Sequence, residues 1–392
     1  MSEQRAIARE LARASRENES VVLASVVRTE GTTYRAVGAR MIVRASGATV
    51  GLLSSGCLEG EIIERAARVR ESGVAEVMTY DGRSDDELVW GLGTGCNGLV
   101  EILLERRTPE SAGVLGALLA RALDDVQPSV IATVVRASGA GAPRVGARVL
   151  VRAGGDVARD GDWGESSVLE SVIADARSAE VSARRGMTLE YVLAPYDGRS
   201  VGDAVTAQLS FELVTPVIDL IICGSGPDAI PVARLATSLG WFVTVVDPRP
   251  TALIAPERFG DARVVECARS ESLCDVVAPT ARAAAIIMSH NYERDLDYLD
   301  ALAGSEVAYL GVLGPRARTE RLLRDLESRG RPFAKSMLAR LFAPVGLDVG
   351  GDGAETIALS IVAEVSSVMH GRTGLHLREG AAAAIHGAES LV

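Results

Sequence analysis

Two cysteines stand in glycine-rich segments where a thiol can do chemistry. Cys57 lies in the string Ser-Ser-Gly-Cys-Leu-Glu-Gly, and Cys96 lies in Gly-Thr-Gly-Cys-Asn-Gly. Thiolates at glycine-rich turns and helix starts have a lowered pKa and serve as nucleophiles or as ligands for soft partners such as metals and sulfur. Cys57 also precedes an expected helix over 58–72, whose dipole favours a thiolate, an effect that Glu59 and Glu61 partly oppose. Both thiols are therefore candidate metal ligands and catalytic groups, and a buried structural role is the alternative.

A repeated stretch of sequence supplies a control for these cysteines. Residues 24–45 and 132–153 are identical at 12 of 22 positions, at a constant offset of 108. The second copy has no cysteine between Arg106 and Cys223. What both copies share, including Val-Gly-Ala-Arg, is expected to be scaffold. The cysteines that only the first copy keeps are more readily explained by function.

A phosphate-binding turn is predicted near the middle of the chain. Gly224-Ser-Gly-Pro-Asp-Ala229 follows an apolar strand, opens a helix and matches the pattern G-x-G-x-x-A. Gly224 permits the tight turn, Gly226 lets a pyrophosphate approach, and the start of the helix favours the anion. Asp247 follows at the interval where an acid binds ribose hydroxyls. A sheet of this type without a dinucleotide is the alternative.

Further polar residues are expected at the same edge of the sheet. In open α/β sheets, ligands bind outside the carboxyl ends of the strands. Besides the turn, the strand ends carry Asp247-Pro-Arg249, Ser289-His290-Asn291 and 311–316, which includes Gly311, Gly314 and Arg316. His290 is a candidate acid/base group. Arg249 and Arg316 could pair with phosphate or carboxylate, although surface salt bridges are a commoner use of arginine.

Composition excludes some classes of partner. The net charge of −11 and the pI near 5.1 argue against general binding to nucleic acid or anionic membranes. The apolar runs are too short to span a bilayer, and the charged N-terminus lacks the apolar core of a secretory signal. Five cysteines without a C-x-x-C pair fit reduced thiols in a cytoplasmic protein. Of these, Cys223 is expected in the core.

The pattern of strands and helices predicts an α/β protein. A set of short strands, a helix and glycine-rich turns occurs twice, which predicts an N-terminal α+β domain built from two tandem pseudo-repeats over 1–108 and 109–215. From Val217, apolar strands alternate with amphipathic helices, the signature of a parallel, Rossmann-like sheet. This C-terminal domain is expected over 216–392 and includes a helix at 354–369.

At this point the chain resembles the XdhC/CoxI family, the accessory proteins of xanthine dehydrogenase and related molybdenum hydroxylases. Two of the motifs that carry the resemblance contain the cysteines: Gly38-Ala-Arg-Met41 with Gly51-Leu-Leu-Ser-Ser-Gly-Cys57-Leu-Glu59, and Gly91-Leu-Gly-Thr-Gly-Cys96-Asn-Gly98. A third motif consists of the glycine turn with Asp247-Pro-Arg249, the residues from His290 to Asp295, and Gly311-Val-Leu-Gly314. The last is Ala343-Pro-Val-Gly-Leu-Asp-Val-Gly350 before a helix with Glu355, Ser360 and Glu364. The family usually has glycines where Ser54 and Ser55 stand, and small neutral residues where Pro227 and Asp228 stand.

The resemblance implies a cytoplasmic chaperone rather than a catalyst. Such proteins bind molybdenum–molybdopterin, protect it while a cysteine desulfurase helps to install a sulfido ligand, and deliver it to an apo molybdenum hydroxylase of the xanthine dehydrogenase or CO dehydrogenase type. It also implies a homodimer. The implied cofactor-binding residues are Gly56, Cys57, Glu59, Gly95, Cys96, Gly224, Ser225, Gly226, Asp247, Arg249, Gly311 and Gly314.

Other functions remain open from the residues alone. One is an NAD(P)-dependent oxidoreductase that uses Gly224, Gly226 and Asp247, with His290 as acid/base. A second is a divergent paralogue that serves another enzyme or has a new activity, and the bound cofactor of the Rossmann-like domain is then NAD(P) or another nucleotide. A third is a degenerate scaffold that holds partner proteins and binds neither ligand.

Overall fold

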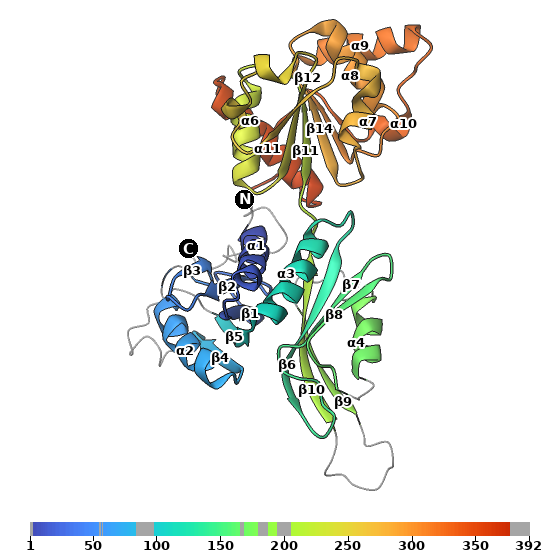
Figure 1. The fold of residues 1–392 in the computed structure, drawn as a ribbon. Coiled ribbons are helices and arrows are strands. Elements are labelled where there is room, and N and C mark those ends of the chain that lie inside the picture. Colours follow the sequence, from blue (N-terminus) through green and yellow to red (C-terminus); the bar gives the residue numbers. More distant parts are fainter. Residues whose placement is uncertain are drawn as a thin grey trace, which may run out of the picture. The chain divides into compact units, whose positions relative to one another are not determined.

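Strands dominate the first half of the chain, and a parallel sheet fills the second half (Figure 1). The structure, a computed structural model, describes residues 3–54, 56, 58–83, 98–164, 168–178, 187–193 and 205–376. The chain divides into two units, Ser2–Pro216 and Val217–Val392. Each unit is described by itself below.

The first unit begins with helix α1 and a five-stranded antiparallel sheet. The elements are α1 (Glu3–Arg16), β1 (Val21–Gly31), β2 (Arg40–Val43), β3 (Thr49–Gly51), α2 (Glu59–Ser72), β4 (Glu76–Asp81) and β5 (Gly98–Arg107). Their order in the sheet is β3-β2-β1-β5-β4. Helix α2 packs its apolar residues Ile62, Ala66 and Val69 into the core. It ends at Gly73, whose φ of 67° is the left-handed conformation that glycine adopts without strain.

The same succession of elements follows in the rest of this unit. They are α3 (Pro109–Leu123), β6 (Ser129–Ser138), β7 (Arg148–Arg152), β8 (Val157–Asp160), α4 (Val168–Ala176), β9 (Met187–Leu193) and β10 (Val205–Val214). The strand order β8-β7-β6-β10-β9 matches that of the first sheet. The register matches as well, since Ser25 lies opposite Arg40 and Thr133 lies opposite Arg148, 108 residues later. We call the two sets of elements the first and second repeat.

Each repeat supplies a buried arginine that pairs with a glutamate of the other repeat. Arg40 on β2 is 2% exposed and donates to Glu212 on β10, with 2.9 Å between Nη1 and Oε1. Arg148 on β7 is 1% exposed and forms the matching pair with Glu105 on β5. The two repeats are thus joined by reciprocal ion pairs.

Two glycines make room for these pairs. Gly38 and Gly146 have φ of 91° and 87°, and a Cβ at either position would overlap the carboxylate that comes from the other repeat. Their carbonyls also accept from the arginines, at 2.9 Å for Arg40 and 2.8 Å for Arg148. The string Val-Gly-Ala-Arg, which both repeats share, therefore forms the contact between them.

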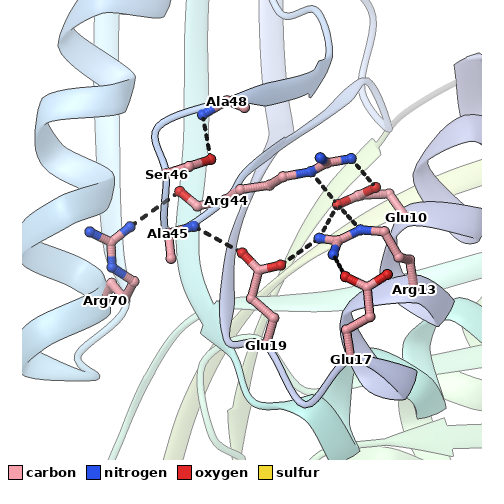
Figure 2. Close-up of polar contacts among 9 residues, drawn as sticks. All are labelled: Glu10, Arg13, Glu17, Glu19, Arg44, Ala45, Ser46, Ala48 and Arg70. Atoms are coloured by element: carbon pink, nitrogen blue, oxygen red, sulfur yellow. Dashed lines mark hydrogen bonds and ion pairs between the residues drawn. The ribbon is translucent and has the colours of Figure 1, made fainter.

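Helix α1 is fixed to the hairpin of β2 and β3 by a cluster of charges. Figure 2 shows Glu10, which is 6% exposed, accepting from both Arg13 and Arg44. Arg44 binds it through two nitrogens, each at 2.7 Å. Glu19 extends the cluster from Arg13 to the backbone N–H of Ala45. Two-pronged arginine–carboxylate pairs fix orientation as well as distance, so this cluster sets how α1 lies on the sheet.

The second unit is a six-stranded parallel sheet covered on both faces by helices (Figure 1). Its order is β13-β12-β11-β14-β15-β16, the order of dinucleotide-binding sheets. The elements are β11 (Asp219–Cys223), α6 (Ala229–Ser238), β12 (Phe242–Asp247), β13 (Arg263–Glu266), α7 (Leu273–Val277), β14 (Ala283–Ile287), α8 (Tyr292–Leu302), β15 (Tyr309–Val312), α9 (Arg316–Ser328), α10 (Lys335–Leu338), β16 (Leu341–Phe342) and α11 (Ala354–Met369).

The central strands are apolar because both of their faces are covered. Every residue of β14 is buried, and its sequence is Ala-Ala-Ala-Ile-Ile. Helices α6 and α11 pack in one core cluster, and α7, α8 and α9 pack in the other. The predicted fold class, an α+β domain followed by a Rossmann-like sheet, is confirmed. Among the described residues, no helix combines the length and the apolar character needed to cross a bilayer.

Candidate functional site

The predicted glycine turn lies where the order of strands in the parallel sheet reverses. Gly224 follows β11 with a φ of 126°, and a Cβ there would come within 2.7 Å of the backbone of Met288 and Ser289, just after β14. With glycine at position 224, the ends of β11 and β14 therefore approach more closely than a residue with a Cβ atom would allow. Ligands of such sheets bind in the crevice at this point.

Ser225, Asp247 and Arg249 form one hydrogen-bonded cluster beside this turn. The Ser225 hydroxyl donates to Oδ2 of Asp247 at 2.5 Å. Arg249 donates to Oδ1 of Asp247 from its backbone N–H at 3.0 Å and from Nε at 2.8 Å. Its Nη2 donates to Oδ2 at 3.1 Å and to the Ser225 hydroxyl at 2.8 Å. The turn after β11 is thereby tied to the end of β12.

This cluster decides what Asp247 can bind. Burial alone would raise the pKa of Asp247, but the hydrogen bonds from Arg249 and Ser225 outweigh it and lower the pKa to about 2. A carboxylate offers about four acceptor positions, and here four donors fill them. Arg249 remains 52% exposed, and no partner of its Nη1 occurs in the described part of the chain. The cluster thus presents a cation at the sheet edge, not a free carboxylate.

His290 lies across the same turn in a strained backbone conformation. Its φ is 56°, a region that side chains other than glycine rarely occupy and that is common at functional sites. Its Nε2 is 3.2 Å from Oδ2 of Asp228, the residue before α6. A Cβ on Gly226 would touch the His290 ring at 3.4 Å. The predicted residues Gly224, Gly226 and His290 therefore do lie together.

The other predicted residues of this edge have different surroundings. Gly311 lies inside β15 rather than beyond its end, and a Cβ there would meet Val345 at 2.6 Å. Gly314 follows the strand with a φ of 123°, next to Arg318. Arg316 is 79% exposed and pairs with Glu320 one turn along α9, so it forms a surface pair.

Sequence reasoning missed a buried ion pair beside Gly314. Asp295 is 1% exposed, and its Oδ2 is 2.7 Å from Nη1 of Arg318. Its Oδ1 accepts from both the backbone N–H and the hydroxyl of Ser289, beside His290. The signal is present in the sequence, because Asp295 lies one turn after Asn291, which caps α8. This network holds the segment after β14 in place.

A second network holds the loop before α11. Glu364 accepts from the backbone N–H of Gly346 at 2.8 Å and from the hydroxyl of Tyr309. Ser360 donates to the carbonyl of Leu347. Two polar residues of α11 that form part of the sequence motif, Ser360 and Glu364, are therefore used to shape this loop.

In the first unit, Glu59 closes the loop that contains Gly56 and Cys57. Its carboxylate accepts from the backbone N–H of Ser54 at 2.7 Å and from the Ser54 hydroxyl. That hydroxyl accepts in turn from the N–H groups of Gly56 at 3.2 Å and Leu58 at 3.1 Å. Burial would raise the pKa of Glu59, but the hydrogen bonds from Ser54 lower it. The positions of Cys57, Gly95 and Cys96 lie outside the described residues.

The three described cysteines are buried or half-buried, and burial raises the pKa of each thiol. Cys223 is fully buried. The thiols of Cys267 and Cys274 donate to the carbonyls of Arg269 and Ala301. No group of three or more potential metal ligands occurs in the parts of the chain with described coordinates.

Two segments of the chain match known families. Residues 14–81 match the XdhC and CoxI family, and residues 220–365 match the XdhC Rossmann domain. The chain belongs to the XdhC and CoxI family. The glycine turn, the Ser225–Asp247–Arg249 cluster and His290 all fall in the XdhC Rossmann domain, and the loop closed by Glu59 falls in the XdhC and CoxI segment.

Two known proteins and one solved structure are similar to this chain along most of their length. The chain is 29% identical to a probable xanthine dehydrogenase subunit of Bacillus subtilis, over 89% of this chain and 93% of that protein. It is 24% identical to the molybdenum cofactor insertion chaperone PaoD of Escherichia coli, over 89% and 84%. A crystal structure described as a xanthine dehydrogenase from Bacillus halodurans has the same fold, with a TM-score of 0.68, 24% identity, and coverage of 98% and 99%.

Proposed function

We propose that this protein is an accessory factor that binds the molybdenum cofactor and assists its insertion into a molybdenum hydroxylase of the xanthine dehydrogenase type. Membership of the XdhC and CoxI family supports the proposal, as do relatives named for xanthine dehydrogenase and for cofactor insertion. Molybdopterin carries a phosphate, so a binding site for it needs groups that bind an anion. The cofactor is the cargo of this protein rather than its resident group.

The Ser225–Asp247–Arg249 cluster is the observation that carries the proposal. It places an exposed guanidinium next to a glycine turn, where a phosphate can approach the backbone and pair with the arginine. Ser225 and Asp247 orient this guanidinium, since they fix its Nε and Nη2. A phosphate of the pterin or of an appended nucleotide would bind through the remaining N–H groups of Arg249.

Cys57 and Cys96 are proposed to hold the molybdenum or its incoming sulfur. Glu59 supports this role indirectly, because it shapes the loop on both sides of Cys57 instead of binding the ligand itself. A cysteine desulfurase as the source of sulfur, and the cytoplasm as the compartment, are further parts of the proposal. A sister repeat that has the same sheet without these cysteines supports a duplication in which the second copy became scaffold.

The geometry disfavours the alternative of an NAD-dependent oxidoreductase. Such enzymes bind the ribose diol with a free carboxylate at the position of Asp247. Here all four acceptor positions of that carboxylate are used within the protein. Asp228 also places a carboxylate before α6, where a pyrophosphate would bind. A 2′-phosphate could still bind Arg249, so NADP is the dinucleotide to test.

A transfer assay tests the proposed function. The chain is purified anaerobically with its cofactor and mixed with an apo hydroxylase of the xanthine dehydrogenase type, and hydroxylase activity is followed. We expect activation by the wild type, and loss of activation with Cys57→Ala or Cys96→Ala. Stabilisation against heat by NADP together with failure to activate would favour the oxidoreductase, because a true cofactor stabilises the fold by mass action. Light scattering would show whether the chain is the proposed homodimer.

A further inference from the structure

A cavity of about 640 Å³ lies between the two repeats of the first unit. This volume is typical of small-molecule sites, which range over roughly 300–1,000 Å³. The walls include Val74 from the turn between α2 and β4, Val114 from α3, and Arg144 and Arg159 from the second repeat. None of these residues belongs to the site described above, and we call this space the inter-repeat cavity.

Comparison of the repeats shows that the charges around this cavity occur at one end only. At the offset of 108, Arg144 and Arg159 correspond to Ala36 and Gly51. The strand pairings relate β5 to β10 by 107 residues, which makes Val214 the counterpart of Arg107. The counterpart of Asp160 is Leu52. The residues that both repeats share explain how the repeats contact each other. The charged residues that only one end carries therefore need another explanation.

The floor of the cavity is a chain of buried, neutralised charges. Nη1 of Arg107 is 2.7 Å from Asp160, and its Nη2 is 3.0 Å from Glu105, which also pairs with Arg148. All four side chains are at most 7% exposed. Since both acids are matched by arginines, they do not repel an anion above them. Buried ion pairs cost desolvation free energy, so this added pair is not explained by stability.

The rim of the cavity carries unpaired positive charge. Arg144 and Arg159 are exposed and form no side-chain hydrogen bond or ion pair with any described residue. Helix α3 begins here after its cap Thr108, and the positive end of its dipole adds to the attraction for an anion. Two exposed acids of the lining, Glu110 and Asp162, oppose this attraction; Glu110 has no described partner, and Asp162 accepts from the backbone N–H of Gly164.

Two valines supply apolar surface in a lining that is otherwise largely polar. Val74 is 69% exposed and Val114 is 44% exposed, although they come from different elements and line the same space. Small-molecule sites combine apolar surface with polar groups that fix the orientation of the ligand. We propose that the inter-repeat cavity binds a small organic anion, a carboxylate or phosphate attached to an apolar body. Arg144 and Arg159 bind the anionic group, and Val74 and Val114 contact the body.

Calorimetric titration of the full chain tests this site. Phenyl phosphate, phenylacetate and inorganic phosphate are the probes, and at least one aromatic anion is expected to bind more tightly than inorganic phosphate. The double change Arg144→Gln and Arg159→Gln should weaken this binding by about tenfold or more, as expected for charged hydrogen bonds. Glu110→Gln should tighten it, a gain that misfolding cannot produce. Arg16→Gln, an exposed arginine outside the cavity, is the matched control and should change nothing.

Three outcomes would overturn the proposal. One is the absence of saturable binding for both aromatic anions. Another is binding that the Arg144/Arg159 double variant leaves unchanged. The third is binding that is lost in Arg249→Gln instead, which would place the anion at the parallel sheet. Whether phenyl phosphate or phenylacetate binds better tells a phosphate ligand from a carboxylate. Loss of the proposed cofactor role would leave these results unaffected, because no residue is common to the two sites.

Discussion

Replacing Glu105 with glutamine should destabilise the first unit more than any exposed charge change. Glu105 is 5% exposed and accepts from Arg148 while pairing with Arg107. The glutamine leaves Arg148, itself 1% exposed, without a counter-ion. Removing one partner of a buried ion pair costs about 3–5 kcal/mol of unfolding free energy. For a unit of this size each kcal/mol lowers Tm by about 2–4 °C, so a fall of about 10 °C is expected.

Thermal unfolding followed by circular dichroism measures this change. Glu212→Gln is the matched control at the other end. A smaller fall is expected there because Arg40 keeps a hydrogen bond to Gln4 besides the one to the Gly38 carbonyl, whereas Arg148 keeps only the bond to the Gly146 carbonyl among the described residues. Burial raises the pKa of Glu105, but Arg107 and Arg148 lower it below the ordinary 4.5. A lowered carboxyl pKa stabilises the fold above the unfolded value and loses that effect as the pH falls. Glu105→Gln should therefore also flatten the loss of stability in acid. A Tm within about 2 °C of the wild type would refute the reasoning.

Two further substitutions and one titration test other parts of the structure. Gly146→Ala should lower Tm markedly, because its φ of 87° and the Glu105 carboxylate leave no room for a methyl group, while Gly154→Ala, with nothing near its Cβ position, should not. Glu59→Ala should leave global stability nearly unchanged but increase amide exchange at Ser54, measured by mass spectrometry, since its carboxylate closes that loop. Carboxyl NMR should show Asp247 ionised down to a pKa of about 2, with its contribution to stability lost only as the pH falls toward that value; an ordinary titration near 3.8 would contradict the cluster.

The second unit can be predicted well because its strands are apolar on both faces. The alternation of strands and helices begins where the sequence indicates, and the helix Ala354–Met369 has the predicted bounds. The two-residue strand β16 has no pattern of its own, and it forms because β15 offers a parallel edge. In the first unit, the sequence does not indicate strand β4. Only one of its six residues is buried, so the strand shows no clear alternation of apolar and polar residues.

Long-range contacts explain what the sequence does not predict at the sites. Arg40 and Glu212 are 172 residues apart, so no local pattern relates them. Asp247 is expected from its spacing to bind ribose, but the hydrogen bonds that occupy it come from Arg249 and from Ser225, a residue on another strand end. The pattern of polar residues at strand ends favours Arg316 over Arg318 as a site residue. In the structure Arg316 faces solvent, whereas Arg318, two positions further along α9, faces Asp295.

The most direct test of the central claim is the molybdenum and pterin content per chain after anaerobic purification from molybdate-replete cells. The account predicts bound pterin in the wild type, at least a tenfold loss in Arg249→Gln, as for a charged hydrogen bond to phosphate, and no loss in the exposed control Arg316→Gln. Equal pterin content in Arg249→Gln and the wild type would contradict phosphate binding by Arg249. The absence of pterin from the wild type and all variants would contradict the proposed function itself.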